Sequence, residues 1–424
     1  MIHFPVIMSV SSFYPHLSYH PILRAMNLHH LPQLRHLTAL LLLTGASLLS
    51  LPSCQRSGSS ATSQVADSLT QEERDDFAQE VTFSYAKRLS VENHPDYKLV
   101  TIHHPDEAKD LARYILYPRG AKKPELQADA YIEVPLRSIA CLSTSQVGAL
   151  PLLGAVDQLV GVSDLNLLND EEILTRVKEG KIQVIGQGMS KNYEAIAALR
   201  PDALLVSFFS EDSQEAELSK TGIHVLLDYE WKEETLLGRA EWLKFLGMLL
   251  GKNAVATKHF SQIEADYRAT LDLVKQAGAP LPTLYGLDYQ GAWYLPGEKS
   301  YVADLLTSAG LRADVTPGAV SGQPAPFEQV IARHRQDSLW ICMPPNDIKT
   351  IQAFSQLHAR YADFTAVRSG RVLVPNKRVN ATGGNDFWQT GVYEPNLQVK
   401  DLVFLTRPDL LPSYTPKYWI ALQR

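Results

Sequence analysis

One long amphipathic segment separates two parts of the chain that have similar hydrophobic patterns. Residues 252–277 contain no Gly or Pro, and Gly278, Pro280 and Pro282 follow directly. The apolar positions recur at steps of three and four residues, at Ala256, Phe260, Ile263, Tyr267, Leu271 and Val274. This spacing lays one apolar stripe along a helix that is roughly 39 Å long. We therefore predict a single helix that joins two similar lobes.

Short β-branched runs alternate with helical patterns on both sides of this helix. The alternation predicts an α/β fold with two Rossmann-like lobes, in which helices cover central, mainly parallel sheets. We place the first lobe at residues 81–232, a helical region at 233–280 and the second lobe at 281–424. Residues 83–135 differ from the rest, because short strands with turn breaks, prolines and charges predict a β-rich entry to the first lobe.

An internal repeat supports two related lobes. NYEAIAALRPDALLV at residues 192–206 matches PFEQVIARHRQDSLWI at residues 326–341 after a one-residue insertion. A second pair, residues 145–150 and 300–305, shares the pattern Ser-x-Val-x-x-Leu. Both pairs occur in the same order, which favours a duplication. The strand ends and helix N-termini of two such lobes are expected to face one ligand cleft.

The front of the chain has the pattern of a lipoprotein signal. Residues 37–51 form an uncharged apolar run that ends at Leu-Pro-Ser-Cys, which is too short to span a bilayer comfortably. The small residue before Cys54 resembles a bacterial lipobox, which implies lipidation of Cys54. The alternative is a plain secretory signal. We predict a signal peptide over residues 1–53, with Met26 as a possible true start, and a flexible lipidated tether over residues 54–80.

Composition excludes several classes of protein. The 424 residues are 45% hydrophobic and 20% charged, as in an ordinary globular protein. A net charge of −6 leaves no basic surface for nucleic acid. The cysteines at positions 54, 141 and 342 form neither a disulfide framework nor a zinc motif. Cys141 and Cys342 lie in apolar runs and are predicted to be buried in strands.

Four motifs resemble the substrate-binding proteins of ABC importers for iron-siderophores, haem and cobalamin. They are RSIACLSTSQVGALPLLGAVDQLVGVSD, the G-x-x-x-x-N-x-E-x-I-x-A-L-x-P-D stretch, AWYLPGEKSYVADLLTSAG and NATGGNDFWQTGVYEPNLQVKDLVFLTRPDLLP. The resemblance covers about residues 81–412. It implies two lobes joined by one rigid helix, with only small lobe movements.

The resemblance also implies a role for two repeated glutamates. In that family one glutamate on each lobe pairs with arginines of the permease dimer, and Glu194 and Glu328 occupy those places. The same glutamates can also be read as helix N-terminal carboxylates stabilised by the helix dipole. Both interpretations can hold together.

Loops that follow the strands supply the candidate ligand contacts. In the first lobe these are Ser143, Thr144, Ser145, Gln187, Met189, Lys191, Phe208 and Phe209, and in the second lobe Tyr289, Trp293, Tyr294, Arg378, Asn380, Trp388 and Tyr393. Aromatic and polar groups together suit a bulky ligand such as a ferric siderophore, haem or cobalamin. Arg378, with Lys377, is suited to carboxylates. Each aromatic can equally belong to a lobe core.

Other functions have less support in the sequence. The histidines have no metal-ligand spacing, and Gly186-x-Gly188 lacks the third glycine of a dinucleotide site. We expect no catalytic residues, no bound metal ion and no cofactor of the protein's own. We predict a monomeric, lipid-anchored binding protein of a Gram-negative envelope, facing the periplasm, that delivers a chelate to an ABC permease and its ATPase. The alternative is a surface or periplasmic lipoprotein that binds another protein or a glycan.

Overall fold

The structure is a computed structural model that describes residues 69–105, 107–188, 190–208 and 213–424. These residues belong to one unit, which spans residues 67–424. The predicted signal peptide, Cys54, Met189 and Phe209 lie outside the described residues.

The helices and strands of both lobes alternate as predicted. The helices are α1 (Gln71–Ala78), α2 (Thr144–Leu153), α3 (Glu171–Lys178), α4 (Tyr193–Leu199), α5 (Gln214–Ser219), α6 (Leu236–Glu241), α7 (Leu243–Leu250), α8 (Asn253–Gln276), α9 (Tyr301–Ser308), α10 (Phe327–His334), α11 (Ile351–Gln356), α12 (Thr365–Ser369) and α13 (Pro395–Thr406). The strands of the first lobe are β1 (Leu89–Asn93), β2 (Lys98–His103), β3 (Asp110–Pro118), β4 (Ala130–Val134), β5 (Ile139–Cys141), β6 (Leu159–Val162), β7 (Gln183–Val184), β8 (Gly186–Gln187), β9 (Ser190–Lys191), β10 (Ala203–Val206) and β11 (His224–Leu227). Those of the second lobe are β12 (Leu281–Pro282), β13 (Leu284–Tyr285), β14 (Asp288–Tyr289), β15 (Ala292–Leu295), β16 (Leu311–Arg312), β17 (Gln323–Pro326), β18 (Trp340–Ile341), β19 (Val372–Val374) and β20 (Ile420–Ala421).

A parallel sheet forms the centre of the first lobe. Its strand order is β11-β10-β5-β6-β7, and every neighbouring pair is parallel. All residues of β5 and β10 are buried, as expected for strands that helices cover on both faces. Cys141 in β5 is fully buried, as predicted. The mixed α/β fold with parallel sheets is therefore confirmed for this lobe.

The predicted β-rich entry is a separate sheet of order β1-β2-β3-β4. Strands β1, β2 and β3 are antiparallel neighbours, whereas β3 and β4 are parallel. One face of this sheet joins the core of the first lobe. The Tyr114 hydroxyl on β3 accepts the backbone N–H of Leu227 at 3.0 Å. This contact ties β3 to the end of β11.

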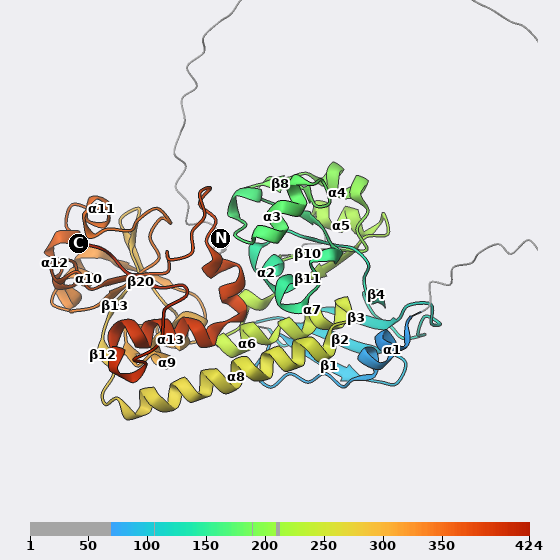
Figure 1. Cartoon of the computed structure of the whole chain (residues 1–424), viewed down its shortest axis with the longest axis horizontal. Coiled ribbons are helices and arrows are strands. Elements are labelled where there is room, and N and C mark those ends of the chain that lie inside the picture. The colour runs from blue at the N-terminus through green and yellow to red at the C-terminus, as the bar shows by residue number, and fades with distance from the viewer. Residues whose placement is uncertain (1–68, 106, 189, 209–212) are drawn as a thin grey trace, which may run out of the picture. The chain divides into compact units, whose positions relative to one another are not determined.

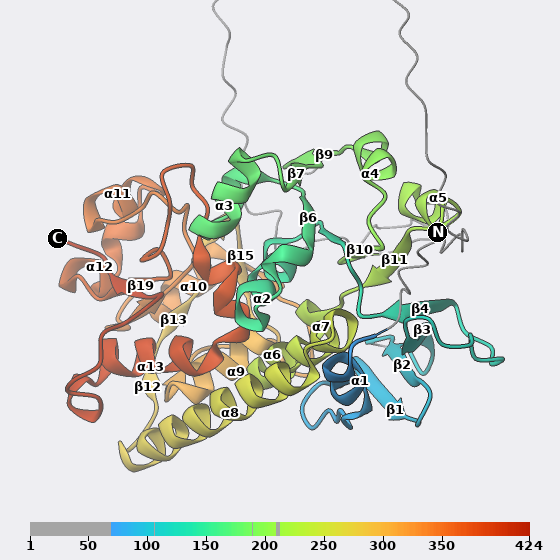
Figure 2. The ribbon, with the colours of Figure 1, turned by 45° about the vertical axis from the view of Figure 1, so that its right-hand side comes forward.

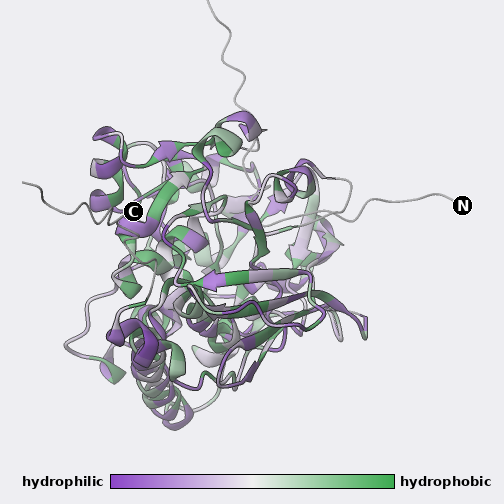
Figure 3. Cartoon of the chain, turned by 90° about the vertical axis from the view of Figure 1, so that its right-hand side faces the viewer, coloured by the Kyte–Doolittle hydropathy of each residue, from purple (hydrophilic) through white to green (hydrophobic). Residues whose placement is uncertain are grey.

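The second lobe is built on a smaller sheet of order β13-β18-β19-β20. Strands β13, β18 and β19 are parallel, and β20 is antiparallel. Large aromatic side chains fill its core, including the fully buried Trp293 and Trp340, whose ring centroids are 5.4 Å apart. Cys342, directly after β18, is also fully buried. Figure 3 shows hydrophobic residues in the strands of the interior and hydrophilic residues on outer helical turns.

Helix α8 spans Asn253–Gln276, within one residue of the prediction at each end. Helix α8 contacts α7, which packs into the core of the first lobe, and α13 of the second lobe. Figures 1 and 2 show α8 running along these two helices. Ala256 belongs to the core of the first lobe, while Phe260 and Tyr267 belong to the next core. One apolar stripe thus enters two hydrophobic cores. Leu271 and Val274, at the far end of the stripe, are only partly buried.

The start of α8 is capped from outside the helix. Its own N-cap residue, Lys252, makes no side-chain cap. The Asp76 carboxylate instead accepts the backbone N–H groups of Asn253 and Ala254, each at 3.0 Å. Asp76 lies in α1, which occupies residues 71–78 of the predicted tether. The predicted tether therefore ends before residue 80, because α1 packs Phe77 into the core of the first lobe.

We expect Asp76→Ala to lower the free energy of unfolding by about 1 kcal/mol, because two N–H groups of α8 lose their acceptor. Urea unfolding of the mature chain measures this change. Asp75→Ala is the matched control, since Asp75 lies in the same helix and its carboxylate accepts only the exposed side chain of Gln71. Equal losses in the two variants would show that the cap contributes nothing.

Candidate functional site

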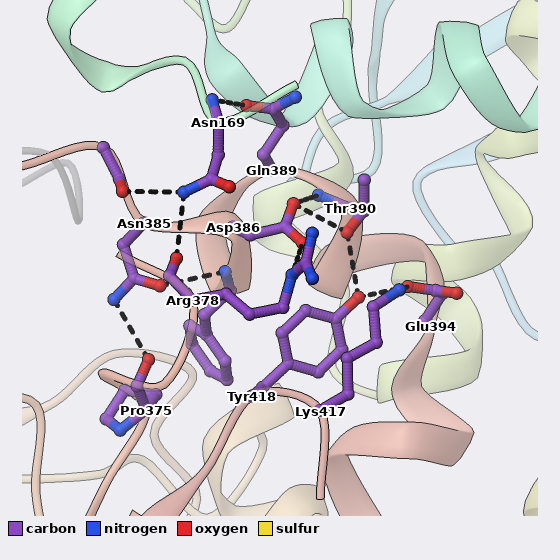
Figure 4. Close-up of polar contacts among 12 residues, drawn as sticks. Asn169, Pro375, Arg378, Asn385, Asp386, Gln389, Thr390, Glu394, Lys417 and Tyr418 are labelled. Carbon is purple, nitrogen blue, oxygen red and sulfur yellow. Dashed lines mark hydrogen bonds and ion pairs between the residues drawn. The ribbon is translucent and has the colours of Figure 1, made fainter. Parts of the chain in front are cut away.

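Loops at the carboxyl ends of parallel strands in the two lobes meet directly. Asn169, in the loop after β6, donates its backbone N–H to Gln389 Oε1 at 2.8 Å. Its side-chain amide donates to the carbonyl oxygens of Arg378 and Gly384, each at 3.0 Å. Figure 4 shows Asn169 pointing into the segment that follows β19. One asparagine of the first lobe therefore holds three points of the second.

Further hydrogen bonds join the same two segments. Thr144 Oγ1 donates to the Trp388 carbonyl at 3.2 Å, and Thr382 Oγ1 donates to the Asn166 carbonyl at 3.0 Å. The Asn380 amide donates to the Leu168 carbonyl. The lobes are thus in contact along this line, where we expected a cleft. The reason is that the segment from 376 to 390 turns back towards the first lobe.

Two glycines allow this close approach. A Cβ atom on Gly148 would lie 2.3 Å from the Gln389 carbonyl oxygen. A Cβ atom on Gly384 would lie 2.7 Å from the backbone of Leu167. Both distances are far below van der Waals contact. Side chains at these positions would push the lobes apart.

A chain of polar groups lies beneath the contact line (Figure 4). Arg378 Nε donates to Asp386 Oδ2 at 2.6 Å, and Thr390 Oγ1 donates to Asp386 Oδ1 at 2.8 Å. The Tyr418 hydroxyl oxygen lies 2.9 Å from Thr390 Oγ1 and also contacts the Glu394 carboxylate. Burial and the charge of Glu394 raise the pKa of Tyr418, so its hydroxyl stays protonated and donates to Glu394. The chain therefore has a cation at each end, Arg378 beside Asp386 and Lys417 beside Glu394, and the hydroxyls of Thr390 and Tyr418 lie between the two carboxylates.

Arg378 is the exposed end of this chain. Its side chain is 48% exposed, whereas that of Asp386 is 4% exposed. Burial lowers the pKa of Arg378, but the hydrogen bond and the charge of Asp386 outweigh it and raise the pKa overall. Because Nε is bonded to Asp386, the guanidinium is held in one orientation. Among the residues that the structure describes, its two outer nitrogens make no hydrogen bond.

A buried ionisable cluster lies where β11 ends. Glu230 pairs with Arg239 at 2.6 Å, and both side chains are less than a tenth exposed. Asp228 is 1% exposed, and burial followed by the charge of Glu230 raises its pKa to about 8. Among the described residues, neither Asp228 Oδ2 nor the Tyr393 hydroxyl has a hydrogen-bond partner. Burial, with the charge of Asp228 next, raises the pKa of Tyr393.

A pocket of about 720 Å³ opens on the first lobe. It is lined by Val184, Gly186, Gln187, Ser190, Lys191, Asn192, Tyr193, Glu194 and Gln214. Asp164 Oδ2 accepts the Gly188 N–H at 2.8 Å and so holds the turn between β8 and β9 beside it. Lys191 is paired with the buried Glu215, which also accepts the Tyr193 hydroxyl at 2.8 Å. Burial and this bond raise the pKa of Tyr193 to about 12.

Most of the candidate contacts chosen from the sequence fall into three groups. Thr144, Arg378, Asn380 and Trp388 lie at the lobe contact. Gln187 and Lys191 line the pocket of the first lobe, and Phe208 is 59% exposed after β10. Tyr289 and Tyr294 are partly buried on β14 and β15.

Three of the candidates present no surface to a ligand in this structure. Ser145 is 6% exposed and its hydroxyl lies 2.9 Å from that of Ser143. Trp293 is fully buried, and its indole N–H donates to the Tyr285 carbonyl at 2.8 Å. Tyr393 is fully buried against the core of the first lobe. Strand position alone did not reveal that these residues face inwards.

Sequence reasoning missed several residues that form the contact. Asn169 lies in an unremarkable Asn-Asp pair before α3, and nothing near it in the sequence indicates a partner two hundred residues away. Gln389 and Asp386 lie within NATGGNDFWQTGVYEP, a run used only for its resemblance. The paired glycines of that run are the one local signal for a close approach of backbones.

Glu194 and Glu328 occupy equivalent positions. Each is the second residue of a helix that follows an exposed segment, Glu194 in α4 and Glu328 in α10. Both are exposed. Glu328 pairs with Arg360 at 2.6 Å. The two glutamates that the predicted repeat aligns therefore occupy the same position in their helices.

Neither a metal-binding cluster nor a membrane-spanning helix occurs in the part of the chain that the structure describes. No set of three or more His, Cys, Asp or Glu side chains among the described residues is arranged to hold a metal ion. None of the helices in this part of the chain combines the length and the apolar character needed to cross a membrane.

Comparison with known proteins identifies a family. Residues 139–378, more than half of the chain, match the family described as periplasmic binding protein. Two uncharacterized lipoproteins of Methanocaldococcus jannaschii are related to the chain. One is 22% identical over 66% of this chain and 67% of its own length, and the other is 24% identical over 70% and 76%.

Solved structures agree on the fold. A periplasmic heme-binding protein from Pseudomonas aeruginosa has a TM-score of 0.51 and 19% identity, over 66% of this chain and 95% of that chain. The periplasmic heme-binding protein of Vibrio cholerae has a TM-score of 0.50 and 16% identity, over 64% and 99%. Both of these proteins are described as heme-binding proteins.

The buried Asp228 predicts a pH dependence. Its folded-state pKa of about 8 lies above the unfolded value of about 4. Between these values the folded state binds more protons, so the free energy of unfolding falls as pH rises, by at most about 1.4 kcal/mol per pH unit. Asp228→Asn removes this contribution. Urea unfolding from pH 5 to pH 8 should therefore show a flatter profile for the variant.

Asp272→Asn serves as the control for this experiment, because Asp272 lies on α8 with its side chain 67% exposed. Its profile should follow that of the wild type. A slope for Asp228→Asn equal to the wild-type slope would mean that Asp228 does not titrate in this range.

Proposed function

The chain belongs to the periplasmic binding protein family, and from that premise we propose that it is the lipid-anchored substrate-binding component of an ABC importer. Its ligand is a bulky chelate, an iron-siderophore, haem or cobalamin. One observation carries this proposal. Loops at the carboxyl ends of parallel strands in the two α/β lobes meet, and the single helix α8 joins the two lobes. Ligands of open α/β sheets bind at such ends.

Arg378 is the proposed anchor for the ligand. It is the exposed end of the chain of polar groups that runs from Arg378 to Lys417, and Asp386 fixes its orientation. A fixed guanidinium suits carboxylates, because it can donate two parallel hydrogen bonds. Gln187 and Phe208 are the first-lobe groups that we propose to contact the rest of the ligand, since Gln187 is exposed at the end of β8 and lines the pocket, and Phe208 is exposed after β10.

Helix α8 supports capture with little lobe movement. It carries no Gly or Pro, and its apolar stripe is buried in two cores, so bending it would expose apolar surface. The ligand then binds a largely preformed site, and affinity depends on contacts rather than on wide closure.

Delivery to the permease is proposed to use Glu194 and Glu328. The two carboxylates are exposed at equivalent helix starts of the duplicated lobes. Such a pair suits a partner with two-fold symmetry, because charge complementarity orients the encounter. Lipid on Cys54 would keep the protein near that permease at the periplasmic face of a Gram-negative envelope. The related lipoproteins support such an anchor.

Tryptophan fluorescence of the purified mature chain tests the ligand proposal against ferric chelates, haemin and cyanocobalamin. At least one should quench with a Kd in the micromolar range or below. For that ligand, Arg378→Gln should weaken binding about tenfold to a hundredfold, as expected for loss of a charged hydrogen bond.

Arg333→Gln is the matched control, because Arg333 is an exposed arginine on α10 that pairs with Asp314 at 3.0 Å. It should bind like the wild type. A stable protein that binds nothing in the panel would favour the alternative, a lipoprotein that binds another protein or a glycan.

Charge reversal tests the docking proposal. Glu194→Lys with Glu328→Lys should reduce uptake of the bound ligand at least tenfold, because the two carboxylates orient the encounter with the permease. Ligand binding is measured separately for Glu328→Lys alone, which should stay within about twofold of the wild type, because Glu194 lines the same pocket as Gln187 whereas Glu328 does not. Glu217→Lys with Asp272→Lys reverses two exposed charges elsewhere and should leave uptake unchanged. Full uptake by the Glu194 and Glu328 double variant would refute the docking role.

A further inference from the structure

A serine, a histidine and an aspartate form a hydrogen-bonded line on the sheet β1-β2-β3-β4. Ser90 Oγ lies 2.8 Å from His103 Nε2, and His103 Nδ1 lies 2.9 Å from Asp110 Oδ1. These residues precede the segment that matches the periplasmic binding protein family, residues 139–378. They are also separate from the lobe contact.

Three adjacent strands bring the groups together. Ser90 on β1 is paired with Thr101 on β2, and His103 lies two residues further along β2 on the same face. His103 is paired with Asp110 at the start of β3. The register shifts between Ile102 and His103, and such a bulge re-aims the side chains next to it.

With a neutral imidazole, the donors and acceptors in this line have one consistent assignment. An ionised aspartate only accepts hydrogen bonds, so His103 Nδ1 carries the proton and donates to Asp110. The neutral imidazole then has an unprotonated Nε2, which accepts the Ser90 hydroxyl. This is the arrangement of a nucleophile, a base and a group that orients the base.

A pocket adjoins the line. It has a volume of about 390 Å³, and both Ser90 and His103 line it. Phe83, Leu89 and Val91 give it apolar walls. The His103 and Asp110 side chains are 36% and 45% exposed, so a molecule in solution can reach them.

We propose that Ser90 is a nucleophile that accepts an acyl group from an activated ester with a small apolar acyl chain. Ser90 Oγ forms a bond to the carbonyl carbon while its proton passes to His103 Nε2. The bond from that carbon to the leaving alcohol oxygen breaks, and the proton passes from Nε2 to the alcohol. Water then attacks the acyl-serine by the same steps, releasing the carboxylic acid and free Ser90.

The reaction is expected to be slow. Lys87 also lines the pocket and is the cation available to the developing oxyanion. Its side chain is 60% exposed and pairs with Glu234 at 3.0 Å, so it is not a fixed donor. Loss of one fixed oxyanion donor costs about 10²- to 10³-fold in rate. We therefore expect labelling of Ser90, with at most weak turnover.

Labelling of the purified mature chain with a fluorophosphonate, followed by intact-mass measurement and peptide mapping, tests the proposal. The wild type should gain one phosphonyl group, on Ser90, and Ser90→Ala should gain none there. His103→Gln should react at least about a hundredfold more slowly. Ser219→Ala is the control and should react like the wild type, since Ser219 is an exposed serine whose hydroxyl donates to the Ala216 carbonyl at 2.7 Å.

Asp110 acts as a positioning residue, and its test has a separate readout. Asp110→Asn should slow labelling, whereas Asp110→Glu, which keeps the carboxylate, should restore much of the rate. Circular dichroism of each variant verifies the fold. Labelling of Ser90 at the wild-type rate in His103→Gln, or no labelling of Ser90 in the folded wild type, would overturn the proposal.

Discussion

The arrangement of the described residues depends on one helix that is buried in two cores at once. Ala256 packs into the first core, and Phe260 and Tyr267 pack into the next. Because the stripe is continuous, the helix cannot rotate in one core without exposing apolar groups in the other. Asp76 adds a cap at its first turn. The two lobes are therefore positioned by the same rigid element.

The lobe contact is a consequence of this arrangement. With the lobes held at one separation, short polar side chains such as Asn169 and Thr382 can bridge their facing loops. Gly148 and Gly384 permit the backbones to come close enough. Arg378 remains exposed at the edge of this contact and supplies a charge that is oriented before any ligand arrives. The proposed function uses both properties, the fixed separation of the two lobes and the fixed orientation of the Arg378 guanidinium.

Much of the fold was predictable because its signals are local and periodic. The stripe of α8 recurs over about five turns, and the runs IAC and ALLV are apolar without interruption, as in strands covered on both faces. The matching positions of Glu194 and Glu328 followed from a repeat visible in the sequence. The end of the tether was placed too late, because the packing of α1 against the lobe depends on residues far along the chain.

The candidate site was predicted only in part. Arg378 and Asn380 were chosen because they follow a strand, and they do lie where the lobes meet. Trp293 and Tyr393 were chosen by the same rule, and both are buried in lobe cores. Residue type and distance from a strand end do not specify which way a side chain points.

The sequence by itself determined the main helices and strands and the class of fold, because hydrophobic residues recur with the periods of strands and helices, two and 3.6 residues. The tertiary structure alone decided which side chains meet. Asn169 and Gln389 are in contact although they lie 220 residues apart in the sequence. His103 likewise lies between Ser90 and Asp110, which belong to different strands of one sheet. Such contacts depend on register, close backbone approach and the turn of a loop, which are properties of packed elements and not of any one segment.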